Sequence, residues 1–144
     1  MKEIFRSLAS APSSTANFGP GFDTFGLALD LFEDKIEITK YETKRKKISI
    51  KIEDTKYTVP KKINENSASL VVMKMMEDHG INNDIEIKIT KNVPPGYGIG
   101  SSAASSAAAA LAFDRLFNLN LDKRKLIKYA AEGEIASAGI KHYD

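Results

Sequence analysis

The stretch that organises the chain runs from Lys91 to Ser106 and reads KNVPPGYGIGSSAASS. Two prolines and three glycines fall within seven consecutive residues of this stretch, 94–100. Proline ends a strand ladder, and glycine lets the backbone turn sharply and approach a ligand closely. The segment therefore predicts a tight loop, with Ser101 or Ser102 as the N-cap of a following helix.

Regular patterns flank this loop on both sides. Before it, residues 84–91 alternate, with Ile85, Ile87 and Ile89 on one face, and this alternation predicts a half-buried strand. After it, an alanine run followed by larger apolar residues predicts a helix over residues 103–117. A strand, a glycine loop and a helix N-terminus together favour phosphate binding through backbone N–H groups and the helix dipole. The alternative is a tight connection whose glycines serve only the turn.

The rest of the chain divides into strand-like and helix-like segments. Strand patterns cover residues 4–11, 25–30, 35–41 and 48–52, with a turn expected at 31–34. Helix patterns cover residues 66–78 and 125–138, the second as one or two segments around Gly133. Residues 12–23 and 58–63 are expected to be irregular. Strands come mostly first and helices mostly later. This order predicts an α+β fold with helices on one face of a mixed sheet.

The length, charge and residue composition of the chain exclude several classes of protein. A length of 144 residues suits one domain. The net charge of +2, from 21 basic and 19 acidic residues, does not argue for nucleic acid, and the basic run at residues 44–47 reads as a solvated loop. The chain has no cysteine, which excludes a disulfide scaffold and thiolate metal sites and fits a reducing cytoplasm. Without a long apolar segment, neither a signal peptide nor a membrane span is expected.

Three ordered motifs resemble the GHMP kinases, small-molecule kinases named for galactose, homoserine, mevalonate and phosphomevalonate. The first is the pattern Pro-x-Gly-x-Gly-x-Gly-Ser-Ser-Ala-Ala at residues 94–104. The second, residues 11–28, resembles the N-terminal signature of the homoserine kinases within this family. The third, residues 133–142, is similar to their helix and the loop after it. Galactokinases and mevalonate kinases carry a Gly-Glu-His element that this chain lacks.

The resemblance implies a fold and a domain organisation. It implies the two-layer, ribosomal-protein-like fold of the GHMP kinase N-terminal domain, with residues 1–144 as the ATP-binding domain. The family's C-terminal domain, which closes the site, is then absent from this chain. Whether the 144 residues alone are active is left open.

The resemblance also implies site residues, position by position. The positions that would bind ATP are Asn66, at the adenine, and the loop residues Pro95, Gly96, Tyr97, Gly98, Ile99, Gly100, Ser101 and Ser102. Ser102 and Glu134 would hold Mg²⁺. Asn17, Asp23 and His142 would hold the substrate, with Asp23 as the catalytic group that orients the attacking hydroxyl. For Glu134 the alternative is a solvated helix residue, and for His142 it is a structural histidine.

The implied reaction is phosphorylation of the side-chain hydroxyl of L-homoserine by MgATP. The product would be O-phospho-L-homoserine, a compound of threonine biosynthesis. Two alternatives stay open: another GHMP kinase acting on shikimate or a mevalonate-type alcohol, and a non-catalytic binding module. The second follows because this fold also occurs in ribosomal proteins and elongation factors. The expected partners are therefore small molecules, without nucleic acid or membrane, and a homodimer is left open.

Overall fold

The computed structural model describes residues 3–16, 26–53 and 55–135. In chain order the elements are β1 (Glu3–Thr15), β2 (Leu27–Tyr41), β3 (Ile48–Glu53), a 3-10 helix (Ile63–Glu65), α1 (Ser67–Asp78), β4 (Ile85–Thr90), α2 (Ser101–Phe117) and α3 (Lys123–Glu132).

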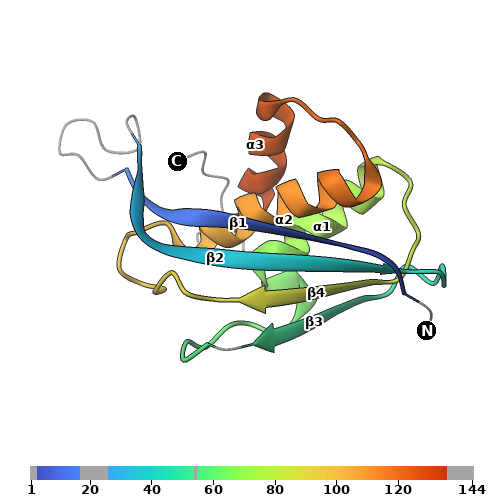
Figure 1. Cartoon of the computed structure of the whole chain (residues 1–144), viewed down its shortest axis with the longest axis horizontal. Helices are drawn as coiled ribbons and strands as arrows, with labels where there is room; N and C mark the ends of the chain where they lie inside the picture. Colours follow the sequence, from blue (N-terminus) through green and yellow to red (C-terminus); the bar gives the residue numbers. More distant parts are fainter. Residues whose placement is uncertain (1–2, 17–25, 54, 136–144) are drawn as a thin grey trace.

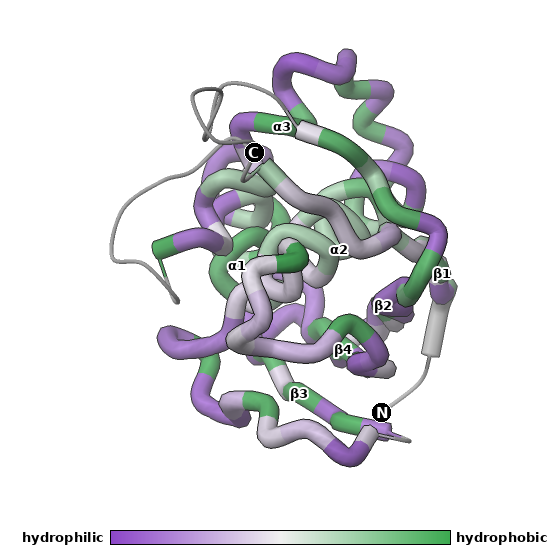
Figure 2. Tube along the Cα trace, turned by 90° about the vertical axis from the view of Figure 1, so that its left-hand side faces the viewer, coloured by the Kyte–Doolittle hydropathy of each residue, from purple (hydrophilic) through white to green (hydrophobic). Residues whose placement is uncertain are grey.

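The four strands form one mixed sheet in the order β1-β2-β4-β3. β1 and β4 both run antiparallel to β2, whereas β3 and β4 are parallel. The three helices lie on one face of this sheet, with α2 against β1 and β2 (Figure 1). Viewed from the end of the strands, α1 and α2 lie side by side and α3 covers them (Figure 2). The predicted α+β fold with helices on one face is confirmed.

The core lies between the sheet and the helices. Ile36 and Ile38 of β2 and Ile85, Ile87 and Ile89 of β4 are at most 1% exposed. Burying each such side chain stabilises the fold by roughly 1.5–3 kcal/mol. The alanines of α2 carry little bulk, so this helix packs closely against β1 and β2. The alternation seen in the sequence therefore marks the buried face of the sheet.

The opposite face of the sheet carries charged side chains in an ion-pair ladder. Glu37 of β2 pairs with Arg6 of β1 at 3.8 Å and with Lys88 of β4 at 3.5 Å. Lys88 also pairs with Glu53 of β3 at 3.5 Å, and Glu53 pairs with Lys51 at 3.1 Å. Exposed pairs of this kind contribute only about 0–1 kcal/mol each. Their polarity explains why the helices cover only the other face.

β2 is continuous, so the expected turn at residues 31–34 is wrong. β1 pairs with β2 within this segment and beyond it: Pro12 lies opposite Glu33, and Ser13 lies opposite Leu29. The register shift accommodates the extra residues of β2 as a bulge rather than as a turn. The strands expected at 25–30 and 35–41 are therefore two parts of one strand.

The element ends differ from the prediction in two further places. β1 extends to Thr15, although residues 12–23 were expected to be irregular; Pro12 is tolerated because β1 is an edge strand. α3 begins at Lys123, two residues before the expected 125, and ends at Glu132 with Gly133 as its C-cap, which agrees with a break of the predicted helix at this glycine; residues 136–138 of the prediction lie outside the described residues. The strand at 48–52, the helix at 66–78 and the irregular segment before the 3-10 helix agree with the prediction.

Candidate active site

The glycine loop between β4 and α2 depends on three glycines with positive φ. Gly96, Gly98 and Gly100 have φ values of 85°, 69° and 72°, which other residues rarely adopt. A Cβ atom at Gly100 would lie 2.3 Å from the hydroxyl oxygen of Ser14, because the loop packs against β1 there. The backbone N–H of Ser14 also donates to the carbonyl of Ile99 at 2.9 Å. The end of β1 therefore supports the loop.

The start of α2 differs from the prediction. Gly100 is the N-cap, so the expectation that Ser101 or Ser102 caps the helix is wrong. Both serines lie in the first turn, and their hydroxyls bond elsewhere: Ser101 Oγ donates to the carbonyl of Val93 at 2.8 Å, which joins the two ends of the loop. Because glycine has no side chain, the N-cap residue does not cover the N–H groups of the first turn. The positive end of the helix dipole faces the loop.

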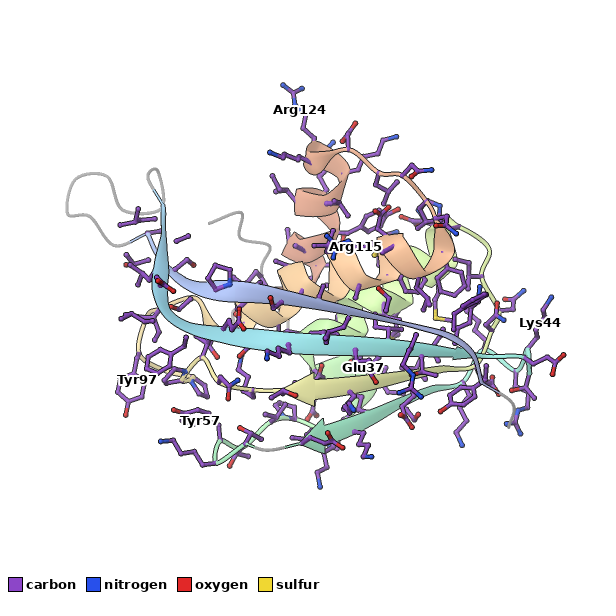
Figure 3. All side chains as sticks on the ribbon, viewed as in Figure 1. Glu37, Lys44, Tyr57, Tyr97, Arg115 and Arg124 are labelled. Carbon is purple, nitrogen blue, oxygen red and sulfur yellow. The ribbon has the colours of Figure 1, made fainter. Side chains whose placement is uncertain are left out.

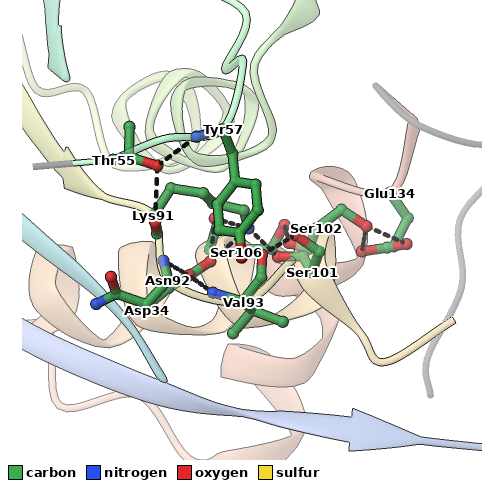
Figure 4. A network of polar contacts seen from close by, with 11 residues as sticks. Asp34, Thr55, Tyr57, Lys91, Asn92, Val93, Ser101, Ser102, Ser106 and Glu134 are labelled. Atoms are coloured by element: carbon green, nitrogen blue, oxygen red, sulfur yellow. Dashed lines mark hydrogen bonds and ion pairs between the residues drawn. The ribbon is translucent and has the colours of Figure 1, made fainter. Parts of the chain in front are cut away.

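Ser102 and Glu134 contact each other beside the loop (Figure 4). Ser102 Oγ donates to the carboxylate of Glu134, at 3.0 Å from Oε1 and 3.1 Å from Oε2. Glu134 is only 8% exposed, which excludes the alternative of a solvated helix residue. Gly133 makes this approach possible, since a Cβ atom there would lie 1.9 Å from Ser106 Oγ. The two residues expected to hold Mg²⁺ are thus brought together.

A cavity of about 410 Å³ opens next to the glycine loop. Residues 58–60 and 66–67 line one side of it, and residues 95–96 and 98–102 line the other. The N-termini of α1 and α2 both border this cavity. Its volume is typical of a small-molecule site. Tyr97 does not line it; its side chain is 76% exposed and points to solvent (Figure 3).

Asn66 forms part of the cavity wall and is the N-cap of α1. Its side-chain oxygen accepts from the N–H of Ser69 at 3.2 Å, and its amide nitrogen donates to the carbonyl of Pro60 at 2.8 Å. The residue is 3% exposed. It therefore fixes the shape of the wall, and direct contact with adenine stays a prediction.

A buried ion pair that the sequence analysis did not identify lies under the loop. Lys91 Nζ bonds to Asp34 Oδ2, to the carbonyl oxygen of Ser101 and to Ser105 Oγ (Figure 4). Asp34 is fully buried and Lys91 is 6% exposed. Burial lowers the pKa of the Lys91 ammonium below its ordinary value, against the opposing charge of Asp34.

The alternation of buried and exposed residues along β2 and β4 predicts that both members of this pair face the core. Asp34 continues the inward series of Ile36 and Ile38, and Lys91 continues that of Ile85, Ile87 and Ile89. Residues two apart share a face of a strand. The β2–β4 register, extended by one step from Lys35 opposite Thr90, sets Asp34 opposite Lys91.

Three expected site residues, Asn17, Asp23 and His142, lie outside the described residues. The chain on either side of residues 17–25 lies near the glycine loop. Thr15 of β1 pairs with Leu27 of β2, and Ser14, next to Thr15, donates its N–H to Ile99 of the loop. Contact of Asn17 or Asp23 with substrate stays a prediction.

The basic run at residues 44–47 serves another part of the fold. Asp84, which is 1% exposed, accepts hydrogen bonds from the Thr43 hydroxyl and from the N–H groups of Arg45 and Lys47. These bonds, that of Thr43 above all, hold the pKa of Asp84 well below its usual range. Lys44 lies at the opposite end of the molecule from Tyr97 (Figure 3). The run is therefore an exposed loop away from the site, as expected.

Two features are absent from the part of the chain that the structure describes. No helix there has both the length and the apolar character that a membrane crossing requires. Among the same residues, no three histidine, aspartate or glutamate side chains converge as a ready-made metal site.

Comparison with known proteins places the chain in a family. Residues 66–144 match the model of the GHMP kinases N terminal domain. The chain belongs to the GHMP kinase family. Its curated relatives include the homoserine kinases of Saccharolobus solfataricus, 43% identical over 136 residues, and of Methanococcus maripaludis, 45% identical over 135 residues. These alignments cover 94% and 93% of this chain, but only 43% and 44% of the relatives. The chain thus spans less than half the length of these relatives.

Solved structures agree with this assignment. Homoserine kinase from Cytophaga hutchinsonii superposes with a TM-score of 0.83 at 33% identity, over 95% of this chain and 43% of that protein. The mevalonate kinase of Methanococcus jannaschii superposes with a TM-score of 0.73 at 18% identity, over 96% of this chain and 49% of that protein. The second likeness shows a shared fold alone. The expected GHMP kinase fold is confirmed.

Proposed function

We propose that this chain is the nucleotide-binding part of a homoserine kinase. The enzyme would transfer the γ-phosphoryl group of MgATP to the side-chain hydroxyl of L-homoserine. The observation that carries the proposal is the contact of Ser102 with the buried Glu134 beside a glycine loop and a helix N-terminus. The substrate assignment is supported by curated relatives named homoserine kinase at 43% and 45% identity.

The glycine loop suits the phosphates of ATP. The backbone of residues 95–102 would surround them, with N–H groups at the start of α2 and the helix dipole stabilising their negative charge. Glycines at 96, 98 and 100 leave the backbone accessible, and no Cβ is present there to hold a ligand away. The neighbouring cavity would take the base, beside Asn66.

Ser102 and Glu134 suit Mg²⁺, which prefers hard oxygen ligands and keeps several waters or phosphate oxygens in its shell. One hydroxyl and one carboxylate meet that preference. When bound, the ion would neutralise charge on the transferring phosphoryl group. Glu134 would hold it against the first turn of α2, next to the phosphates.

The substrate would be held by Asn17, Asp23 and His142. Homoserine presents an ammonium, a carboxylate and a hydroxyl, so an acidic or amide group must meet the ammonium or hydroxyl. Asp23 would orient the attacking hydroxyl. The positive group for the carboxylate would come from the part of the relatives that this chain does not span, where we place the family's second domain.

The other readings have less support. The basic run at residues 44–47 lies at the opposite end of the molecule from the glycine loop, so it supplies no positive surface for RNA there. The solved mevalonate kinase is 18% identical, a likeness in fold alone. Cytoplasmic location and a homodimer stay predictions.

Substitution of Asp23 tests the proposal. Asp23→Asn keeps the volume and removes the charge. In the protein that contains this chain, it should lower kcat/KM for L-homoserine by about tenfold or more, or ~1.4 kcal/mol, while MgATP affinity stays near normal. Asp30→Asn, on the exposed part of β2, is the matched control. If Asp23→Asn and Asp30→Asn have the same kcat/KM for L-homoserine, Asp23 does not contact the substrate.

A further inference from the structure

We propose that Asp34 and Lys91 act as a positioning pair that sets the conformation of the glycine loop. Asp34 does not line the cavity, and Lys91, which borders it, directs its ammonium to three acceptors within the protein. The inference rests on the proposed function in one respect, because it takes this loop to be where nucleotide binds. It adds residues to the site that no motif of the sequence identified.

Asp34 fixes the beginning of the loop. Its Oδ1 accepts from the N–H groups of Asn92 and Val93, each at 2.9 Å. One carboxylate oxygen thus orients two successive peptide units at the point where β4 has ended. Asp34 belongs to β2, so the sheet itself holds the loop in place.

Lys91 and Ser105 connect the same carboxylate to the end of the loop. Lys91 Nζ donates to the carbonyl of Ser101, in the first turn of α2. Ser105 Oγ, one turn further along, donates to Asp34 Oδ2 at 2.8 Å. The bond from Ser101 Oγ to Val93 closes the loop between these anchors. Both ends of the loop are therefore fixed to one buried pair.

The energetics favour a positioning role over a stabilising one. A buried ion pair is often no more stabilising than apolar residues of similar volume, because desolvation offsets its attraction. Here the ammonium's three donors have three acceptors, and the carboxylate accepts four hydrogen bonds. Each bond has a direction, so the pair specifies one loop geometry, which apolar packing would not.

Asp84 provides a matched control at the other end of β4. It is 1% exposed and also accepts from two backbone N–H groups, those of Arg45 and Lys47. Its loop lies away from the glycine loop (Figure 3). Asp34→Asn and Asp84→Asn each remove a buried carboxylate that accepts from two backbone N–H groups and pairs with a basic side chain, Lys91 or Arg45. Only Asp34 contacts the glycine loop.

The test compares these variants in the protein that contains this chain, by amide hydrogen exchange without ligand and by calorimetric titration with MgATP. Asp34→Asn should speed exchange across residues 92–102 by about tenfold or more and weaken MgATP binding by a similar factor. Asp84→Asn should speed exchange at residues 43–47 and leave MgATP affinity within about twofold of wild type. Equal exchange at 92–102 in the two variants would overturn the proposal.

If Asp34→Asn does not fold, two less disruptive variants, Ser105→Ala and Ser106→Ala, test the same proposal. Ser105→Ala removes one hydroxyl from the network, whereas Ser106→Ala removes a neighbouring buried hydroxyl that bonds to the carbonyl of Ser102. Only Ser105→Ala should speed exchange at residues 92–94. If wild type fails to bind MgATP, the proposed function is wrong, and the exchange data alone still decide whether the pair positions the loop.

Discussion

Ser102 Oγ lies 3.0 Å and 3.1 Å from the two carboxylate oxygens of Glu134, although the residues are 32 positions apart in the sequence. The first turn of α2 supplies the hydroxyl, and the residue after the C-cap of α3 supplies the carboxylate. Gly133 allows this proximity because it packs directly on Ser106. The two helices therefore present a pair of hard oxygens next to the glycine loop.

Removing the charge of Glu134 should impair metal-dependent turnover. Glu134→Gln keeps the side-chain shape and an oxygen acceptor for Ser102. We expect kcat to fall by about tenfold or more and the Mg²⁺ concentration for half-maximal rate to rise, measured by steady-state kinetics over a range of Mg²⁺. Glu77→Gln, on the exposed face of α1, is the control. Normal turnover with normal Mg²⁺ dependence in Glu134→Gln would exclude a metal role.

A side chain at Gly98 should block nucleotide. Gly98 and Gly80 both have positive φ, 69° and 61°, and a Cβ at either position would meet no atom within 4 Å. Gly98→Val and Gly80→Val should therefore lose similar stability, about 1–2 kcal/mol, from backbone strain alone. Only Gly98→Val should lose MgATP affinity, as measured by calorimetry. Unchanged affinity in Gly98→Val would show that the loop does not surround the phosphates.

The sequence predicted the elements whose pattern is local. Ile85, Ile87 and Ile89 revealed both the strand and its buried face, and the glycines revealed the loop, because these signals lie within a few residues. The motifs also identified Ser102 and Glu134 as partners, through resemblance rather than through spacing. Their contact depends on how α3 packs on α2, which no local pattern encodes.

What the sequence did not predict depends on tertiary pairing. Residues 31–34 read as a turn, yet β1 pairs across them and converts the irregularity into a bulge. Ser101 reads as an N-cap, but the αL conformation of Gly100 starts the helix one residue earlier. The bond between Asp34 and Lys91 joins residues 57 positions apart. Extending the period of each strand by one step would have placed both residues on the buried face.

The contact between α1 and α3 should respond to alkaline pH. Tyr129 of α3 donates to Asp78 of α1 at 2.8 Å, and burial, followed by this bond, raises the pKa of Tyr129 to about 12. A raised folded-state pKa stabilises the fold fully below the unfolded value of about 10, and this contribution is lost as pH rises through about 12.

Ultraviolet titration of tyrosinate measures this shift. The difference between wild type and Tyr129→Phe isolates the ionisation of Tyr129, which we expect to have its midpoint near 12. The stability advantage of wild type over Tyr129→Phe should decrease over the same pH range in urea unfolding. A midpoint near 10, the ordinary tyrosine value, would contradict the contact.

The central claim is that the protein containing this chain phosphorylates L-homoserine. The most direct measurement is ADP release from MgATP with L-homoserine, mevalonate or shikimate as the acceptor, with the phosphorylated product identified by mass spectrometry. We predict release that depends on L-homoserine and yields O-phospho-L-homoserine, with kcat/KM for the other two alcohols lower by a factor of about 10⁴, because they leave buried polar partners unpaired. Phosphorylation of mevalonate or shikimate without activity on L-homoserine would contradict the account.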